Sequence, residues 1–160
     1  MSSNVTYKYI RQNPDIHTYI KNADAAVKAQ GYTEHSFAHV EKVADTVKMI
    51  LEGLGYDERK VELGMIAAYL HDIGNVINRI DHAQSGAVMA FRLLDNLNMP
   101  AEEICDIISA IGNHDEGTAQ PLNAITAALI IADKTDVRRS RVRNIECLAQ
   151  DIHDRVNFAV

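Results

Sequence analysis

Apolar residues recur at helical spacing along nearly the whole chain, and this periodicity limits the fold more than any other feature of the sequence. Residues 36–55, SFAHVEKVADTVKMILEGLG, show it clearly, with an apolar stripe that repeats every three or four residues. The stripe consists of Val40, Val43, Val47, Ile50, Leu51 and Leu54. Such spacing is typical of an amphipathic helix that buries one face against a core.

Capping residues, prolines and glycines bound five further segments with the same spacing. Asn13 and Pro14, for example, fit the first positions of a helix that Gly31 ends. The helices are predicted within residues 13–31, 36–55, 57–74, 81–98, 100–114 and 121–137. The connections between them are short, and no repeat or linker divides the chain.

The fold class follows from these helices and from the length of the chain. Its 160 residues, 47% of them apolar, suffice for one core. We predict an all-α protein in which residues 1–160 form a single bundle of six or seven helices. Residues 151–160 stay open between a frayed helix and a short extended tail, because Val156, Phe158 and Val160 alternate as in a strand.

Charge and the absence of sorting signals limit the partners. A net charge of −6 argues against binding to a nucleic-acid duplex, although Arg138, Arg139, Arg141 and Arg143 make one segment locally basic. The start of the chain lacks the basic and apolar regions of a signal peptide, and the longest apolar run, 124–132, is too short to span a membrane. We expect a cytoplasmic protein without a membrane partner, and the sequence leaves a homodimer open.

A histidine and an aspartate stand together at the end of an apolar segment, in LHDIGN at residues 70–75. A buried carboxylate without a partner is costly, and a cation removes that cost. Four other imidazoles or carboxylates lie at helix ends or on apolar helices. Together the candidates are His39, His71, Asp72, His82, His114 and Asp133. Any one alone fits a structural role, but the set suits one or two ions of Fe, Mn, Co, Ni or Zn, with Mg²⁺ also compatible.

The motifs around these residues resemble those of the HD-domain superfamily of metal-dependent phosphohydrolases. EHSFAHVEKVA (34–44), IAAYLHDIGN (66–75) and ALIIADKTD (128–136) are similar to its H…HD…D signature, over roughly residues 33–143. DHAQSGAVMA (81–90) and IGNHDEGT (111–118) resemble the segments that its dinuclear branch adds. The chain has Asn75 and Asn113 where some subfamilies carry Lys and His, and it lacks the GYP segment of cyclic-dinucleotide phosphodiesterases.

The resemblance implies a ligand set and a reaction. His39, His71, Asp72 and Asp133 would hold one ion, while His82 and His114 would hold a second that shares Asp72. The implied reaction is hydrolysis of a phosphate ester or anhydride, of a nucleotide or another small molecule, by metal-activated hydroxide. His71 and Asp72 would then be the central catalytic residues.

The basic segment supplies candidates for binding the substrate phosphate. If the helix that carries Asp133 continues, Arg141 returns to the face of Asp133, whereas Arg138 reaches the site only if the helix breaks near Val137. Asp115 and Glu116, next to His114, fit a supporting role. The remaining histidines, His17, His35 and His153, receive no functional role, and His35 fits a capping or surface position.

Two other functions remain compatible with these residues. Some HD-domain proteins use a di-iron site to activate O₂, and the ligand set does not distinguish that oxygenase chemistry from hydrolysis. Other HD domains are non-catalytic modules that sense a metal or a ligand. Such modules usually lack ligands, whereas all six candidates are present here.

Overall fold

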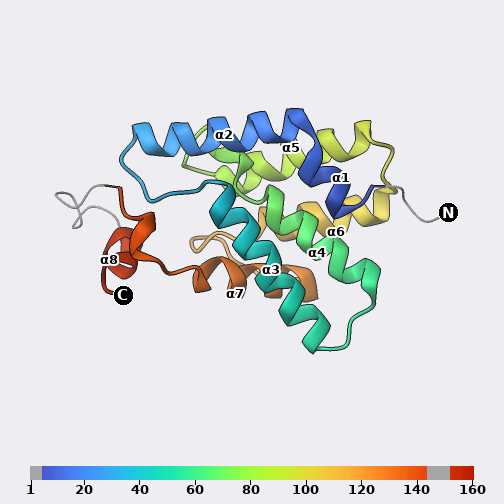
Figure 1. The fold of residues 1–160 in the computed structure, drawn as a ribbon. Coiled ribbons are helices and arrows are strands. Elements are labelled where there is room, and N and C mark those ends of the chain that lie inside the picture. The colour runs from blue at the N-terminus through green and yellow to red at the C-terminus, as the bar shows by residue number, and fades with distance from the viewer. Residues whose placement is uncertain (1–4, 144–151) are drawn as a thin grey trace.

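The computed structural model describes residues 5–143 and 152–160, and every regular element within these ranges is helical (Figure 1). The α-helices are α1 (Tyr7–Gln12), α2 (Pro14–Ala29), α3 (Phe37–Gly53), α4 (Glu58–Leu70), α5 (His82–Asn96), α6 (Ala101–Gly112), α7 (Ala124–Thr135) and α8 (Ile152–Phe158). Two short 3₁₀ helices, η1 (Ile73–Val76) and η2 (Arg139–Arg141), follow α4 and α7. The prediction of an all-α fold is therefore confirmed.

Side-chain caps define the starts of four of the helices. The Asn13 carboxamide oxygen accepts from the backbone N–H groups of the first turn of α2, and Ser36, Asp57 and Asn123 do the same for α3, α4 and α7. Each cap satisfies N–H groups that have no partner within the helix. The ends of α3 and α7, which carry candidate ligands, are thus set by local sequence.

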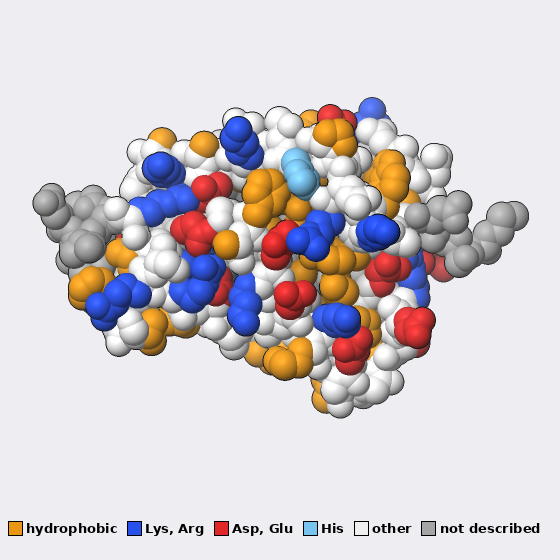
Figure 2. Space-filling model, viewed as in Figure 1, with side chains coloured by type: hydrophobic (Ala, Val, Ile, Leu, Met, Phe, Trp, Pro, Cys, Tyr) orange, Lys and Arg blue, Asp and Glu red, His pale blue; other side chains and the backbone are white. Residues whose placement is uncertain are grey.

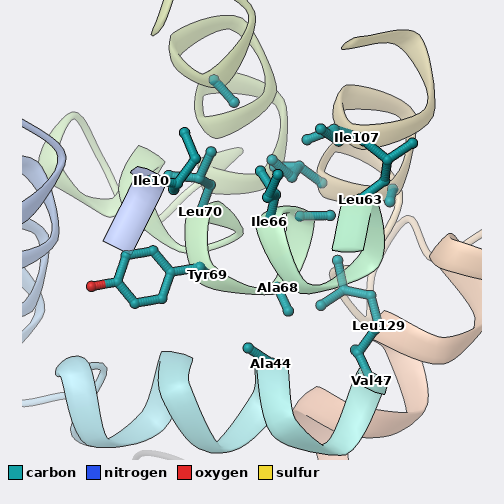
Figure 3. Packing of buried hydrophobic residues seen from close by; sticks show 14 of the residues in the cluster. Ile10, Ala44, Val47, Leu63, Ile66, Ala68, Tyr69, Leu70, Ile107 and Leu129 are labelled. Atoms are coloured by element: carbon teal, nitrogen blue, oxygen red, sulfur yellow. The ribbon is translucent and has the colours of Figure 1, made fainter. Parts of the chain in front are cut away.

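Helix α4 passes through the middle of the molecule and is buried on most sides. Ile66, Ala67, Tyr69 and Leu70 are fully buried, and α3, α6 and α7 pack around them (Figure 3). The approach of α3 is close, because a Cβ on Gly64 would lie 2.6 Å from a Leu51 methyl group. The C-terminal end of this helix, where His71 and Asp72 follow, is therefore held in a tightly packed core.

The turn after Asp72 is fixed by a contact between backbones. Gly74 in η1 lies so close to the start of α5 that an added Cβ would be 2.0 Å from the His82 carbonyl oxygen and 2.5 Å from the Gly86 nitrogen. Only glycine permits this approach. The contact places His82, the first residue of α5, beside the end of α4.

The structure decides two questions that the sequence left open near the C-terminus. Helix α7 ends at Thr135, so no continuous helix carries Asp133 and Arg141. The chain instead bends at Asp136 and makes the short turn η2. For the tail, the helical alternative is correct: residues 152–158 form α8, which packs on η2 (Figure 1). The alternation of Val156, Phe158 and Val160 was therefore not a strand signal.

The surface and the helix lengths bear on possible partners. On the face in Figure 2, basic and acidic side chains are interspersed, with apolar groups between them. Among the described residues, no helix is both long and apolar enough to cross a bilayer. Cys105 is exposed, and Cys147 lies outside the described residues.

Candidate metal centre

Five separate parts of the chain bring the six predicted ligands to one place. His39 comes from α3, His71 and Asp72 from the end of α4, and the other three from α5, α7 and the residue after the C-cap of α6. The six are His39, His71, Asp72, His82, His114 and Asp133. All are buried except Asp133, whose side chain is 14% exposed. Their role as ligands stays a prediction, but their convergence is a property of the fold.

The two oxygens of Asp72 face different imidazoles. Its Oδ2 atom lies 3.1 Å from Nε2 of His71 and 3.6 Å from Nε2 of His39. Its Oδ1 atom lies 3.5 Å from Nε2 of His82 and accepts a hydrogen bond from Nδ2 of Asn75 at 3.0 Å. A carboxylate with this orientation is suited to bridging two cations.

Asp133 completes the first group. Its Oδ1 atom is 3.2 Å from Nε2 of His39 and 3.6 Å from Nε2 of His71. Its Oδ2 atom accepts from the ammonium of Lys134 at 2.6 Å. One oxygen of Asp133 thus faces the imidazoles, while Lys134 neutralises the other.

His114 lies between the two groups. Among the described residues, it belongs both to a triad with His71 and Asp133 and to one with Asp72 and His82. In each triad the ligand atoms lie within 4.8 Å of one another. Its ring centroid is 4.8 Å from that of His71 and 5.2 Å from that of His82. The geometry therefore allows His114 to serve either group.

Each imidazole is anchored through its Nδ1 atom, which leaves Nε2 directed at the carboxylates. Nδ1 of His71, His82 and His114 each lies within hydrogen-bond distance of the carbonyl oxygen three residues earlier, at 2.7, 3.1 and 2.6 Å. Nδ1 of His39 lies 2.8 Å from Oδ2 of Asp136. Such partners accept the Nδ1–H proton and turn the Nε2 lone pair towards the centre, as metal-binding histidines require.

Several buried polar atoms of the centre have no hydrogen-bond partner in the described part of the chain and could bind a cation. Nε2 of His39, Nε2 of His71 and Oδ2 of Asp72 are buried and have no hydrogen-bond partner among the described residues. Buried polar atoms are rarely left in this state. A divalent ion of the kind bound by imidazole and carboxylate would satisfy all three at once.

The pKa values set by the protein groups agree with this fit. Burial lowers the pKa of His114 to about 4, which keeps the ring neutral and able to donate its lone pair. Burial also opposes charge on His71, but the carboxylates of Asp72 and Asp133 outweigh it and raise the pKa to about 10. The carboxylates thus favour positive charge at their centre, which a cation would supply.

Asp136 is a residue of the site that sequence reasoning missed. It is buried one helical turn after Asp133, where it faces His39 and also accepts from Nε of Arg138 at 2.7 Å. Burial raises its pKa, but the bonds from His39 and Arg138 outweigh burial and hold the pKa below its ordinary value. Its spacing of three residues from Asp133, in ADKTD, was the available signal.

His35 was also misjudged, because it is neither a cap nor a surface residue. Only 8% of it is exposed, and its Nε2 atom lies 4.0 Å from Oδ2 of Asp72. Its Nδ1 atom lies 2.6 Å from the Thr33 carbonyl oxygen, like the anchors of the other rings. Burial lowers its pKa well below the ordinary value. His35 therefore presents a fifth imidazole to the centre.

A cavity of about 250 Å³ opens beside these residues. Asp72, Asp133 and three of the imidazoles line it, together with acidic groups, cations and part of α8. The other lining residues are Arg79, Asp115, Glu116, Lys134, Asp136, Val137, Arg141, His153, Val156 and Asn157. Glu116 pairs with Lys134 at 3.3 Å, and Asp115 lies 3.9 Å from Nε2 of His82.

The predicted phosphate ligands Arg138 and Arg141 are engaged within the protein. Arg141 is buried and donates from Nη1 to the Asp136 carbonyl oxygen at 2.7 Å and from Nη2 to the Glu34 carbonyl oxygen at 2.9 Å. Arg138 donates to both carboxylate oxygens of Asp136, at 2.7 and 2.9 Å. Both arginines thus tie the segment after α7 to the loop before α3.

The comparisons with known proteins agree with this geometry. The HD domain family matches residues 36–154, which is most of the chain and contains all six candidate ligands. This chain belongs to the HD domain family. The resemblance seen in its sequence motifs is therefore confirmed, and the buried His and Asp cluster is consistent with the metal site of an HD domain.

Two known proteins are similar to this chain. The uncharacterized protein MJ1020 of Methanocaldococcus jannaschii is 26% identical over 170 residues, which cover 92% of this chain and 65% of the relative. The chain thus spans just under two thirds of that curated protein. The crystal structure of a predicted HD superfamily hydrolase from an uncultured Thermotogales bacterium matches with a TM-score of 0.59 and 25% identity, covering 78% of this chain and 67% of that one.

Proposed function

We propose that this HD domain is a metal-dependent phosphohydrolase that acts on a phosphate ester or anhydride of a nucleotide or another small molecule. The observation that supports it best is the orientation of Asp72, whose two oxygens face separate imidazole groups beside a cavity. A bridging carboxylate of this kind is suited to a pair of ions that act together on one phosphoryl group.

The residues divide into two sets of ligands that share Asp72. His39, His71, Asp72 and Asp133 would hold one ion, and His82 and His114 would hold the other. Bound there, divalent cations supply positive charge to phosphoryl oxygens and promote the deprotonation of water near neutral pH. Imidazole and carboxylate donors favour Fe, Mn, Co, Ni or Zn.

The protein groups orient these ligands and bury their imidazoles. Asp136 and the backbone carbonyl oxygens fix the ring tautomers, while Asn75 donates to Oδ1 of Asp72 and limits its rotation. Because the imidazoles are buried, electrostatic interactions within the centre are stronger than in water. The cations that line the cavity, Arg79, Lys134 and Arg141, offset some of its acidic charge for an anionic substrate.

The test is a panel of phosphate esters and anhydrides, assayed for inorganic phosphate and for the alcohol or nucleotide products, with the metal that copurifies with the protein. Nucleoside mono- and triphosphates, dinucleoside polyphosphates and small sugar phosphates span the classes that fit. We expect metal-dependent turnover of at least one class, and chelation should abolish it.

The panel is run in air and without oxygen, with the iron content measured. Phosphate release that is equal under both conditions supports hydrolysis. The opposite result is an iron-loaded protein that hydrolyses no member of the panel but converts one of them in a reaction that consumes O₂. That result would identify a di-iron oxygenase and refute the proposal.

A further inference from the structure

The cavity beside the centre is rich in acid, which is unfavourable for an anionic substrate. Asp72, Asp115, Glu116, Asp133 and Asp136 all line it. Two divalent ions in the proposed ligand sets would offset the charge of Asp72 and Asp133, whereas Asp115, Glu116 and Asp136 lie outside those sets. A phosphorylated molecule is therefore held best where a further cation at the cavity has N–H groups available to it.

The cations of the last turn of α7 and of the segment after it do not meet this requirement. Arg141 donates through Nε, Nη1 and Nη2 to backbone carbonyl oxygens, and Arg138 donates to Asp136 through two of its nitrogens. Lys134 is held between Asp133, at 2.6 Å, and Glu116, at 3.3 Å. The charge of each is already matched by a protein partner.

Arg79 differs from these residues. Its Nη1 atom lies 3.3 Å from Oδ1 of Asn75 and 3.3 Å from Nε2 of His82, both long for hydrogen bonds. Its Nε and Nη2 atoms have no acceptor among the described residues. The guanidinium lies over the Tyr32 ring, 5.8 Å from the centroid, on the side of the cavity that carries His82. Arg79 is thus oriented by neighbours that leave most of its donors free.

We propose that Arg79 binds the phosphate of the substrate and selects phosphomonoesters and terminal phosphates over phosphodiesters. The inference rests on the phosphohydrolase function proposed above. A guanidinium grips two phosphate oxygens in parallel. A monoester has three terminal oxygens, so one remains for the ligand set around Asp72. A diester has only two, and Arg79 would compete with that ligand set for them.

The first experiment measures binding without turnover, with inorganic phosphate as the probe. Wild type, Arg79→Gln, Arg79→Lys and the control Arg92→Gln are loaded with metal, and phosphate affinity is measured by calorimetry. Arg92 is an exposed arginine of α5, so the control removes the same charge away from the cavity. We expect Arg79→Gln to weaken binding about ten- to hundredfold, with partial recovery in Arg79→Lys and no change in Arg92→Gln.

Metal analysis of each variant separates a phosphate ligand from a structural role. Unchanged metal content with weakened phosphate binding supports the proposal. Equal phosphate affinity in Arg79→Gln and wild type would overturn it. If Arg79→Gln lost bound metal and phosphate affinity to the same extent, the proposal would also be overturned. Arg79 would then act by positioning the candidate ligand His82 and not by binding phosphate.

The second experiment compares a phosphomonoester with a phosphodiester of the same alcohol. We expect wild type to favour the monoester in kcat/KM, and Arg79→Gln to lose about tenfold or more on the monoester alone. A wild-type preference for the diester would overturn the assignment. Failure of the proposed phosphohydrolase function gives a distinct result from failure of the Arg79 assignment. In that case no ester is hydrolysed, while phosphate binding still depends on Arg79.

Discussion

Nδ1 of His39 lies 2.8 Å from Oδ2 of Asp136, and both side chains are buried. Nε2 of the same ring faces Oδ1 of Asp133 at 3.2 Å. One imidazole thus connects two carboxylates of the same chain segment. The Asp136 carboxylate accepts a hydrogen bond from the Nδ1–H group of His39, so that the Nε2 lone pair is available on the side of Asp133. The metal affinity of the first ligand set therefore depends on a residue outside that set.

This relationship predicts that Asp136→Asn weakens metal binding while every ligand remains in place. Asparagine keeps an acceptor for His39 but removes the charge that makes the imidazole more basic. We expect the metal dissociation constant to rise about 10- to 100-fold, measured by competition with a chelator of known affinity. Asp95→Asn, which removes the same charge from the exposed face of α5, is the control. Equal metal affinity in Asp136→Asn and wild type would contradict the role of Asp136.

Sequence reasoning found the six candidate ligands because each carries local evidence. His71 and Asp72 interrupt an apolar segment, and Asp133 lies on an apolar helix. It missed His35 because nothing local shows that it is buried, and it missed Asp136 because its three-residue spacing from Asp133 does not by itself show burial. Both come to the centre through the packing of the α7 end against the loop before α3, a tertiary contact made by Arg141 and Glu34. Such contacts have no periodic signal in the sequence.

The arginines show a second limit of sequence reasoning, and their role in binding phosphate stays a prediction. Four arginines in a short segment indicated a phosphate site, and the argument depended on the length of α7. The helix ends at Thr135. Capping and side-chain bonds around Asp136 decide this end, and periodicity does not report them. Arg79, which stands alone in the sequence, is brought to the cavity only by the turn between η1 and α5.

The shared position of Asp72 predicts different effects of two neighbouring substitutions. Asp72→Ala removes the carboxylate that faces both imidazole groups, so we expect loss of bound metal and of all activity. Asn75→Ala leaves the Asp72 carboxylate in place and removes the hydrogen bonds to its Oδ1 atom and its carbonyl oxygen, as well as the long one from Arg79, so we expect about a tenfold weaker metal affinity. Metal content and phosphate release are measured on both variants, with circular dichroism to verify folding. Losses of equal size would show that Asn75 is a ligand or that Asp72 is not.

The raised pKa of His71 predicts how the stability of the metal-free protein depends on pH. Its pKa is about 10 in the folded protein against an ordinary value of 6.5, so the folded state binds the proton more tightly than the unfolded state. The stabilisation is complete below pH 6.5 and is lost as the pH rises towards 10. The expected loss in the free energy of unfolding is on the order of a few kcal/mol.

Urea unfolding of metal-free protein across this pH range measures the effect, with His71→Asn as the reference. The variant lacks the titrating ring, so its stability should fall less than that of wild type as the pH rises. Parallel curves for the two proteins would show that His71 has an unshifted pKa. Metal-loaded wild type should also lose less stability, since a bound cation replaces the proton as the partner of Asp72 and Asp133.

The contact between η1 and α5 predicts that Gly74→Ala disrupts the second ligand set. An added Cβ would lie 2.0 Å from the His82 carbonyl oxygen and 2.9 Å from the Gly86 Cα, and both are backbone atoms that cannot turn away. The start of α5 must therefore move, and His82 moves with it. We expect a loss of about 2 kcal/mol or more in the free energy of unfolding.

Gly53→Ala provides the matched control, because an added Cβ at this position of α3 meets nothing within 4 Å. Alanine is the better helix former, so this variant should be unchanged or more stable by up to about 1 kcal/mol. In Gly74→Ala we also expect the affinity for a second equivalent of metal to fall more than that for the first, measured by calorimetric titration. Since His39 and Asp133 lie on α3 and α7, their ligand set does not depend on the start of α5. Equal weakening of both equivalents would show that the two ligand sets are not separate.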